Sequence, residues 1–200
     1  MKRIEKEVYK RNRSYRIFDE KVKIDDDTLV DLIDLARYSS SRGNRQPLKY
    51  IICNNDYINE NIFKNLHWAK KIKNWPGPEN GEKPTAYIIV LGDTEISNQL
   101  LIDTGLACQN ILKGAVEIGY GGCMINNIDR VKIRELLNIE EKFEIMLVIA
   151  LGKPKQVSYI ESMSSKENID YWFDNENNVH VPKRAIEDII TKHIRRNSNE

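Results

Sequence analysis

A run of basic residues around one hydroxyl group lies near the start of the chain, and it reads Arg11-Asn12-Arg13-Ser14-Tyr15-Arg16. A phosphate monoester is bound best by two or three charge-assisted donors, ideally guanidinium groups, together with a hydroxyl or a backbone N–H. Arg13, Ser14 and Arg16 could supply such a set. Taken alone, an ordinary basic surface turn explains the run more simply.

A second candidate is the polar loop Ser39-Ser40-Ser41-Arg42-Gly43-Asn44-Arg45-Gln46-Pro47. Its small residues would let the backbone approach a planar ligand closely, and Asn44 and Gln46 offer both donors and acceptors. The alternative interpretation, favoured for the loop by itself, is the end of a helix with Gly43 as its cap.

Two further segments suggest contact with a ligand. Gly119-Tyr120-Gly121-Gly122 follows a predicted helix and opens a strand. A dinucleotide-binding fingerprint has the opposite order, so we reject that interpretation but keep a glycine turn that brings backbone close to a cofactor. Lys183 and Arg184 form a second basic pair, and their simpler interpretation is the N-terminus of the last predicted helix. Positive charge opposes the helix dipole there, which is a reason to look for an anion nearby.

Several other chemistries are excluded. The sequence contains no HExxH, GxSxG or Walker A motif and no paired catalytic carboxylates, and its three histidines lack metal-ligand spacing (His67, His180, His193). Three cysteines without a CxxC pair argue against a disulfide framework or a zinc site (Cys53, Cys108, Cys123). Among the aromatic residues, Trp75 in a Pro/Gly loop is the best candidate to line a ligand site, whereas Tyr171-Trp172-Phe173 suits packing.

The bulk composition limits the possible partners. The chain has 200 residues, a formal net charge of +1 and 40% hydrophobic residues, as expected for one globular domain. Such a balance gives no global field that would attract nucleic acid or an acidic membrane, so a nucleic-acid module built on residues 11–16 is a weak alternative. We find neither a signal peptide nor a long apolar stretch, and we expect a cytoplasmic protein with reduced thiols and no membrane contact.

Hydrophobic periodicity predicts the elements that must position these residues. We expect helices near residues 4–10, 26–38, 57–66, 97–118, 130–137 and 185–194, and strands near 49–53, 86–91, 123–125 and 145–150. The pattern predicts an α+β fold with a mixed central β-sheet flanked by helices. We place the core in residues 1–154 and an extension of the same domain in 155–200. Residues 156–181 are polar and without periodicity, so they could be disordered or form an arm around a partner.

Taken together and in order, these segments resemble the nitroreductase family of flavoproteins. The family's opening R-R-S-x-R-x-F-like stretch is matched by residues 12–18, and its A-R-x-x-x-S-x-x-N-x-Q-P segment by Ala36-Arg37, Ser41, Asn44, Gln46 and Pro47. Its long D-x-G-x-A-x-Q-N helix is matched by Asp103, Gly105, Ala107, Gln109 and Asn110, followed by Ala115, Gly119 and Gly121. Asn12 departs from the family's first arginine, and Leu48 replaces its tryptophan.

The resemblance implies a flavin mononucleotide (FMN) site at the interface of a homodimer. It implies that Arg13, Ser14 and Arg16 bind FMN from one subunit, with Lys183 and Arg184 closing on the phosphate. From the other subunit it implies Ser40, Ser41, Arg42, Asn44 and Gln46. The segment Met124-Ile125-Asn126-Asn127 would lie along the flavin, with a backbone N–H near Asn126 facing N5, and the C-terminal arm would wrap the partner subunit.

The resemblance also implies the chemistry. NAD(P)H would give a hydride to the flavin and leave, and an electron-poor small-molecule acceptor such as a nitro compound or quinone would then bind at the same face, in a ping-pong cycle. Arg16 would act as an electrostatic stabiliser, Trp68 and Trp75 would shape the acceptor pocket, and no side chain would act as a nucleophile. The alternatives are other flavin chemistry, such as ene reduction, dehalogenation or flavin fragmentation, and a flavin-binding protein without turnover.

Overall fold

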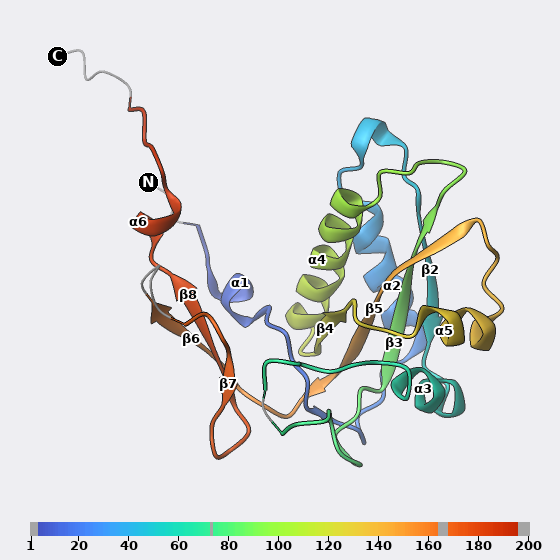
Figure 1. Ribbon diagram of the computed structural model, residues 1–200, viewed down its shortest axis with the longest axis horizontal. Helices are drawn as coiled ribbons and strands as arrows, with labels where there is room; N and C mark the ends of the chain where they lie inside the picture. The colour runs from blue at the N-terminus through green and yellow to red at the C-terminus, as the bar shows by residue number, and fades with distance from the viewer. Residues whose placement is uncertain (1–3, 73, 164–167, 196–200) are drawn as a thin grey trace.

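The computed structural model describes residues 4–72, 74–163 and 168–195 as a sheet-centred core with an arm beside it (Figure 1). The core holds five paired strands in the order β1 (Phe18–Asp19), β5 (Phe143–Pro154), β3 (Ala86–Asp93) and β2 (Leu48–Cys53), with β4 (Gly121–Ile125) also paired to β5. All these strand pairs are antiparallel, and an isolated parallel bridge between Ser14 and Gly122 makes the pairing mixed. The α+β class is confirmed.

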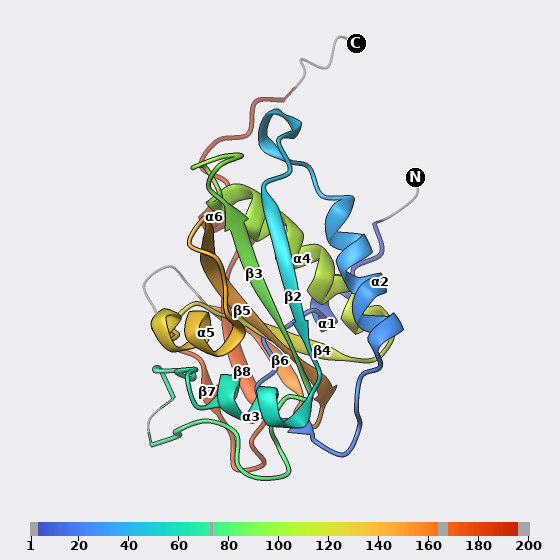
Figure 2. The ribbon, with the colours of Figure 1, turned by 90° about the vertical axis from the view of Figure 1, so that its right-hand side faces the viewer.

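Strand β3 is buried along its whole length, as its apolar sequence predicts. Because side chains alternate across a strand, Ile88 and Val90 pack with α2 (Asp26–Arg37) and α4 (Leu101–Glu117). Tyr87 and Ile89 belong to the opposite cluster, which includes residues of α3 (Asp56–Phe63) and α5 (Arg130–Leu137). The sheet therefore lies between two layers of helices, as Figures 1 and 2 show.

Three helices begin at capping residues that the sequence supplies. The side chains of Asp25, Asn55 and Asp129 accept hydrogen bonds from backbone N–H groups in the first turns of α2, α3 and α5. Helix α4 begins at Leu101 rather than near residue 97, because Ser97 Oγ accepts a hydrogen bond from Gln99 N in the preceding turn. Helix α3 likewise ends at Phe63, before the expected residue 66.

The first and last helices are shorter than their sequence patterns suggest. Helix α1 covers Glu7–Arg11, and a 3-10 turn, η1 (Arg42–Asn44), follows α2. The amphipathic helix expected over residues 185–194 is wrong in extent, because α6 covers only Ile186–Ile189 and contains no buried residue. A short helix is marginal when its apolar face packs against nothing.

The polar tail forms a second sheet, which periodicity did not reveal. Strand β8 (Val179–Arg184) pairs in parallel with β6 (Ser158–Met163) and antiparallel with β7 (Trp172–Phe173). This arm, residues 158–163 and 168–195, stands beside the core (Figure 1). The domain boundary placed at residue 154 stays a prediction, and so does the wrapping of a partner. No helix in the described part of the chain is long and apolar enough to span a membrane.

Candidate functional site

Two adjoining cavities contain most of the residues singled out in the sequence. The Arg13 cavity, of about 220 Å³, is lined among others by Asn12, Arg13, Ser14 and Lys183. The Asn126 cavity, of about 300 Å³, is lined among others by the segment 123–127, with His67, Trp68, Ala69 and Lys70. Arg16, Met124 and Tyr171 line both, so the two cavities form one continuous site.

Backbone contacts hold the basic segment against β4. Ser14 forms a parallel bridge with Gly122, and Tyr15 N donates to Gly122 O at 3.0 Å. A side chain at Gly121 would collide with the ring of Tyr15, since its Cβ would lie 2.6 Å from Tyr15 Cδ2. A Cβ at Gly122 would overlap the carbonyl oxygen of Ala150. The two glycines therefore let the basic segment approach β4 closely.

A buried glutamine ties the same segment to the arm. Gln156 Oε1 accepts hydrogen bonds from Arg16 N at 2.6 Å and from Ile17 N at 3.2 Å, and its Nε2 donates to Asn177 O at 3.0 Å. Gln156 thus joins the core segment to the hairpin between β7 and β8. No local motif in the sequence marks Gln156 for this role.

The Arg13 cavity contains positive charge without a balancing carboxylate. Burial lowers the pKa of Arg13, and burial together with the nearby Arg13 lowers the pKa of Lys183. Arg13 Nε and Asn12 Nδ2 are buried donors without a hydrogen-bond partner in residues 4–72, 74–163 and 168–195. Among the residues that the structure describes, no aspartate or glutamate lines the cavity. Buried donors and cations of this kind call for an anion with several acceptor oxygens.

Arg16 and Tyr171 lie where the two cavities meet. The Arg16 guanidinium carbon is 4.7 Å from the centre of the Tyr171 ring, and Nη1 donates to Ser14 O at 3.1 Å. From the sequence, Tyr171 was expected to be a packing residue. Its place in the site depends on how the arm folds, and only its aromatic neighbours Trp172 and Phe173 hinted at a role.

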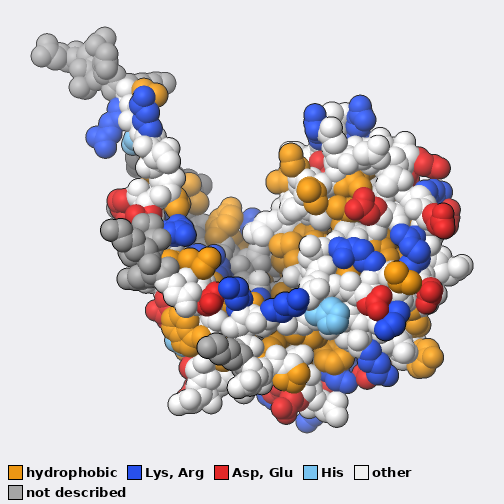
Figure 3. Space-filling model, in the orientation of Figure 1, with side chains coloured by type: hydrophobic (Ala, Val, Ile, Leu, Met, Phe, Trp, Pro, Cys, Tyr) orange, Lys and Arg blue, Asp and Glu red, His pale blue; other side chains and the backbone are white. Residues whose placement is uncertain are grey.

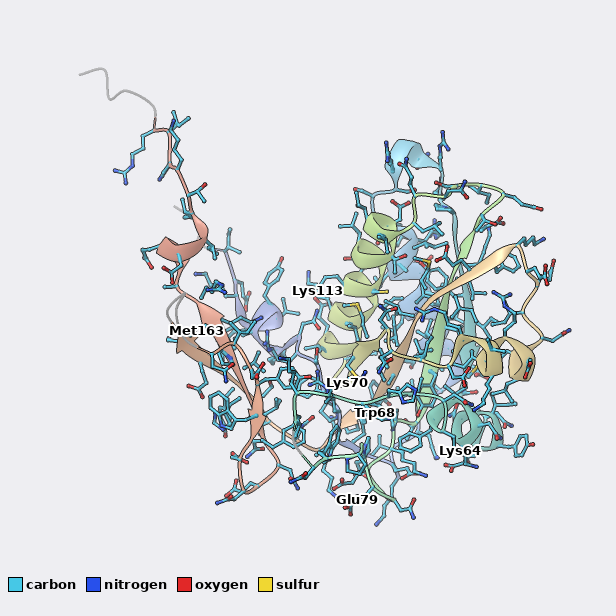
Figure 4. All side chains as sticks on the ribbon, viewed as in Figure 1. Lys64, Trp68, Lys70, Glu79, Lys113 and Met163 are labelled. Carbon is cyan, nitrogen blue, oxygen red and sulfur yellow. The ribbon has the colours of Figure 1, made fainter. Side chains whose placement is uncertain are left out.

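The end of β4 supplies the backbone of the Asn126 cavity. Met124 and Asn126 are exposed, whereas Ile125 between them is buried. His67 N donates to Asn127 O at 3.0 Å, which ties the segment after α3 to this backbone. Trp68 and Lys70 on that segment lie between the core and the arm (Figure 4).

Trp68 lines the Asn126 cavity, whereas Trp75 is not among its lining residues. Trp75 contacts Trp68 edge-on, with ring centres 6.4 Å apart, and contacts Phe173 of the arm at 5.1 Å. Lys71 also pairs with Asp170 of the arm at 2.9 Å. Trp75 therefore supports the rim of the cavity from behind Trp68.

The serine-rich loop lies elsewhere on the same chain. Buried Asp103, near the start of α4, accepts hydrogen bonds from Ser41 Oγ at 2.5 Å and from Arg42 N at 3.2 Å. Asn44 and Gln46 both adopt left-handed backbone conformations, with φ of 54° and 51°, which strain residues other than glycine and often mark functional loops. Five predicted residues are absent from the lining of both cavities within one chain: Ser40, Ser41, Arg42, Asn44 and Gln46. Among the two basic residues of β8, Lys183 lines the Arg13 cavity and Arg184 does not.

The chain is similar to known proteins in both sequence and fold. The chain is 27% identical over 158 residues, 75% of its length and 84% of the relative's, to an Archaeoglobus fulgidus protein named NADH dehydrogenase/NAD(P)H nitroreductase. Among solved structures it resembles a protein with the same name from Parabacteroides distasonis (TM-score 0.63, 21% identity, 82% of this chain and 92% of that one). It also resembles the Vibrio harveyi NADPH:FMN oxidoreductase complexed with NAD+ (TM-score 0.60, 20% identity, 75% and 68%).

Because the sequence identities to these two solved structures are only 21% and 20%, the similarities show the fold alone. The model of the nitroreductase family, in contrast, matches residues 9–153, a span that contains the basic segment, the serine-rich loop and the whole of β4. The chain belongs to the nitroreductase family.

Proposed function

We propose that this protein is an FMN-dependent oxidoreductase that uses NAD(P)H to reduce electron-poor small molecules such as nitro compounds or quinones. Bound FMN would supply the redox chemistry by accepting a hydride from NAD(P)H and passing electrons to the acceptor in a ping-pong cycle. The role of the protein is then to bind the cofactor, orient it and tune its electrostatics.

The observation that carries this proposal is the uncompensated charge of the Arg13 cavity. Arg13 and Lys183 are both partly desolvated, and Arg13 Nε and Asn12 Nδ2 lack acceptors. A phosphate monoester would supply both the negative charge and the acceptor oxygens. Arg13, Ser14, Asn12 and Lys183 would therefore hold the phosphate of FMN. The continuity with the Asn126 cavity leaves room for a planar ring system beyond it.

The remaining site residues fit the rest of such a cofactor. Arg16, at the junction, would place a fixed cation beside the ring and favour its reduced, anionic form. The backbone at Asn126 would offer an N–H to the ring edge, at N5. Trp68, with Trp75 behind it, would bound the space left for the acceptor.

We further propose that the protein works as a cytoplasmic homodimer, in which a second copy completes the site. Large apolar side chains are exposed on α2 and α4, such as Val30 (56%) and Ile102 (68%), and on the end of the arm, such as Ile186 (57%). Figure 3 shows hydrophobic side chains on both sides of the hollow between arm and core. A second copy could cover these surfaces and bring its own serine-rich loop to the site.

The first test is an absorbance spectrum of the purified protein, followed by anaerobic NADH and then NADPH. We expect flavin bands near ~450 nm that survive desalting and bleach on addition of a nicotinamide, and mass spectrometry should identify the released cofactor as FMN. A protein that stays colourless after incubation with FMN would overturn the proposal. Bands that do not bleach would identify a flavin-binding protein without turnover. Product analysis with a nitroarene and an enone would then distinguish nitro reduction from ene reduction.

A further inference from the structure

Arg130, the first residue of α5, connects β5 to Asn126, a residue that lines the Asn126 cavity. Its Nε donates to Ile145 O at 2.8 Å, and its Nη2 donates to Met146 O at 3.0 Å and to Asn126 Oδ1 at 2.6 Å. The two carbonyls belong to β5, and Asn126 follows β4 directly. One guanidinium group therefore ties the Asn126 side chain to β5.

The carbonyl acceptors lie at an irregularity in the sheet. The register between β3 and β5 shifts between Val90 and Leu91, so that Met146 has no partner residue on β3. A bulge interrupts the alternation by which neighbouring carbonyls of a regular strand face opposite sides. Here the carbonyls of Ile145 and Met146 both meet the same guanidinium group.

Arg130 also determines how the Asn126 side chain is oriented. A guanidinium group can only donate hydrogen bonds, so Asn126 must present Oδ1 to it, and the Nδ2 amide group is left to face elsewhere. Asn126 is otherwise an exposed residue at a strand end, where an unanchored side chain and its backbone would sample several conformations. The contact with Arg130 removes that freedom from a residue that lines the cavity.

We infer that Arg130 is a positioning residue for the flavin: it acts through Asn126 to hold the 126–127 backbone in the orientation that favours the reduced cofactor. This inference rests on the proposed function, because it assumes that FMN binds along this segment. A preorganised donor stabilises developing negative charge better than a mobile one, since no reorganisation accompanies the reaction.

The chain offers a matched control on the same helix. Arg134, one turn further along α5, also makes three hydrogen bonds to carbonyls, namely those of Ile139, Glu140 and Phe143. It does not contact Asn126, and it lines neither cavity. Lysine at either position keeps the charge but lacks the planar fork that can bind several acceptors at once.

The experiment is a double-mutant cycle with Arg130→Lys, Asn126→Ala and the double variant, with Arg134→Lys as control. For each variant, the dissociation constant of oxidised FMN and the two-electron reduction potential of the bound flavin are measured. We expect Arg130→Lys and Asn126→Ala each to lower the preference for reduced over oxidised FMN about tenfold, a shift of about 30 mV to more negative potential. The double variant should shift no further than either single one.

Three results would overturn the inference: a potential in Arg130→Lys equal to that of Arg134→Lys, additive shifts in the double variant, or an unchanged potential in Asn126→Ala. The last of these decides the question even if the Arg130 variant fails to fold. Failure of the proposed function is distinguishable, because the wild-type protein would then bind no FMN.

Discussion

Asn12 and Lys183 are far apart in the sequence but line the same cavity beside Arg13. Asn12 stands where the family pattern has an arginine, so the basic segment has one cation fewer than that pattern suggests. Lys183 on β8 brings a cation to the cavity from the arm, and Asn12 contributes a neutral donor that is buried without a partner. We therefore expect affinity for the phosphate to depend on Lys183 more than on its neighbour Arg184.

Replacing Lys183 should accordingly weaken cofactor binding. A hydrogen bond to a charged group contributes ~1.5–3 kcal/mol, so we expect Lys183→Met to raise the FMN dissociation constant by at least ~10-fold. Quenching of FMN fluorescence on titration with apoprotein would measure it. Arg184→Met, with the same change at the next residue, serves as control. Equal losses of FMN affinity in the two variants would contradict the assignment of Lys183 to the phosphate.

Lys70 should influence which acceptors the enzyme prefers. Arg16, His67 and Lys70 line the Asn126 cavity, and within the described part of the chain no aspartate or glutamate does. An acceptor with a carboxylate should therefore react faster than a neutral isostere. The measurement is the ratio of kcat/KM for 4-nitrobenzoate to kcat/KM for 4-nitrobenzamide. We expect Lys70→Gln to reduce this ratio by about fivefold, because a solvent-exposed charge pair contributes ~1 kcal/mol.

The neighbouring Lys71 is the matched control for this prediction. Its ammonium already pairs with Asp170 of the arm at 2.9 Å, so Lys71→Gln should leave the ratio between the two acceptors unchanged. If both variants lower the ratio alike, the preference arises from the general field of the surface and not from the cavity.

At the level of elements, His180 links all three strands of the arm. Its ring stacks on Trp172 of β7 with ring centres 5.1 Å apart and lies 5.0 Å from the ring of Tyr159 of β6. Nδ1 is 2.6 Å from Glu161 Oε1, and Nε2 is 3.4 Å from Asp174 Oδ2. The hydrogen bonds to Glu161 and Asp174 raise the pKa of His180 above its usual 6.5. Because Lys183 lies on the same strand, the order of the arm affects how Lys183 is placed at the Arg13 cavity.

The raised pKa of His180 predicts a pH-dependent arm. A histidine with a higher pKa in the folded state adds stability that is complete below about pH 6.5 and is lost as the pH rises through the folded-state pKa. We expect the urea midpoint of the wild-type protein to fall more between pH 6 and pH 8.5 than that of His180→Gln. The corresponding losses in the free energy of unfolding should differ by ~0.5–1 kcal/mol. His193→Gln, at an exposed position of the arm, should behave like the wild type. If the urea midpoints of all three proteins change with pH in parallel, His180 does not make the stability of the arm depend on pH.

The sequence predicted the core elements better than the arm, for a physical reason. Strand β3 has a continuous apolar sequence and α2 has an amphipathic period and a capping aspartate, which are local signals. Strands β6 and β8 are polar, and β8 contains Pro182 and pairs in parallel with a strand earlier in the tail. Their register depends on contacts such as those of His180, which no local pattern encodes. The candidate site shows the same division, since motif order singled out Arg13, Ser14 and Arg16, which line the Arg13 cavity, but gave no sign of Gln156 or of the place of Tyr171 there.

At the level of the whole molecule, the two parts of the predicted site, the Arg13 cavity and the serine-rich loop, lie apart within one chain. Asp103, which anchors the serine-rich loop, lies about 14 Å along α4 from Leu112 at the Arg13 cavity, at ~1.5 Å per residue. The loop itself extends beyond the start of that helix (Figure 1). A two-fold dimer could bring the loop of one subunit to the cavity of the other, and each site would then need residues from both chains.

This arrangement predicts that two defective variants can restore each other. Arg13→Ala would disable the cavity, and Arg42→Gln combined with Asn44→Gly would disable the loop, where glycine preserves the left-handed backbone at position 44. Each variant alone should have little activity. After subunit exchange at equal concentrations, half of the dimers are mixed and one of the two sites in each is intact, so activity should recover to about a quarter of wild type. If each site is built within one chain, every subunit keeps its own defect, and the mixture should remain as inactive as its two components.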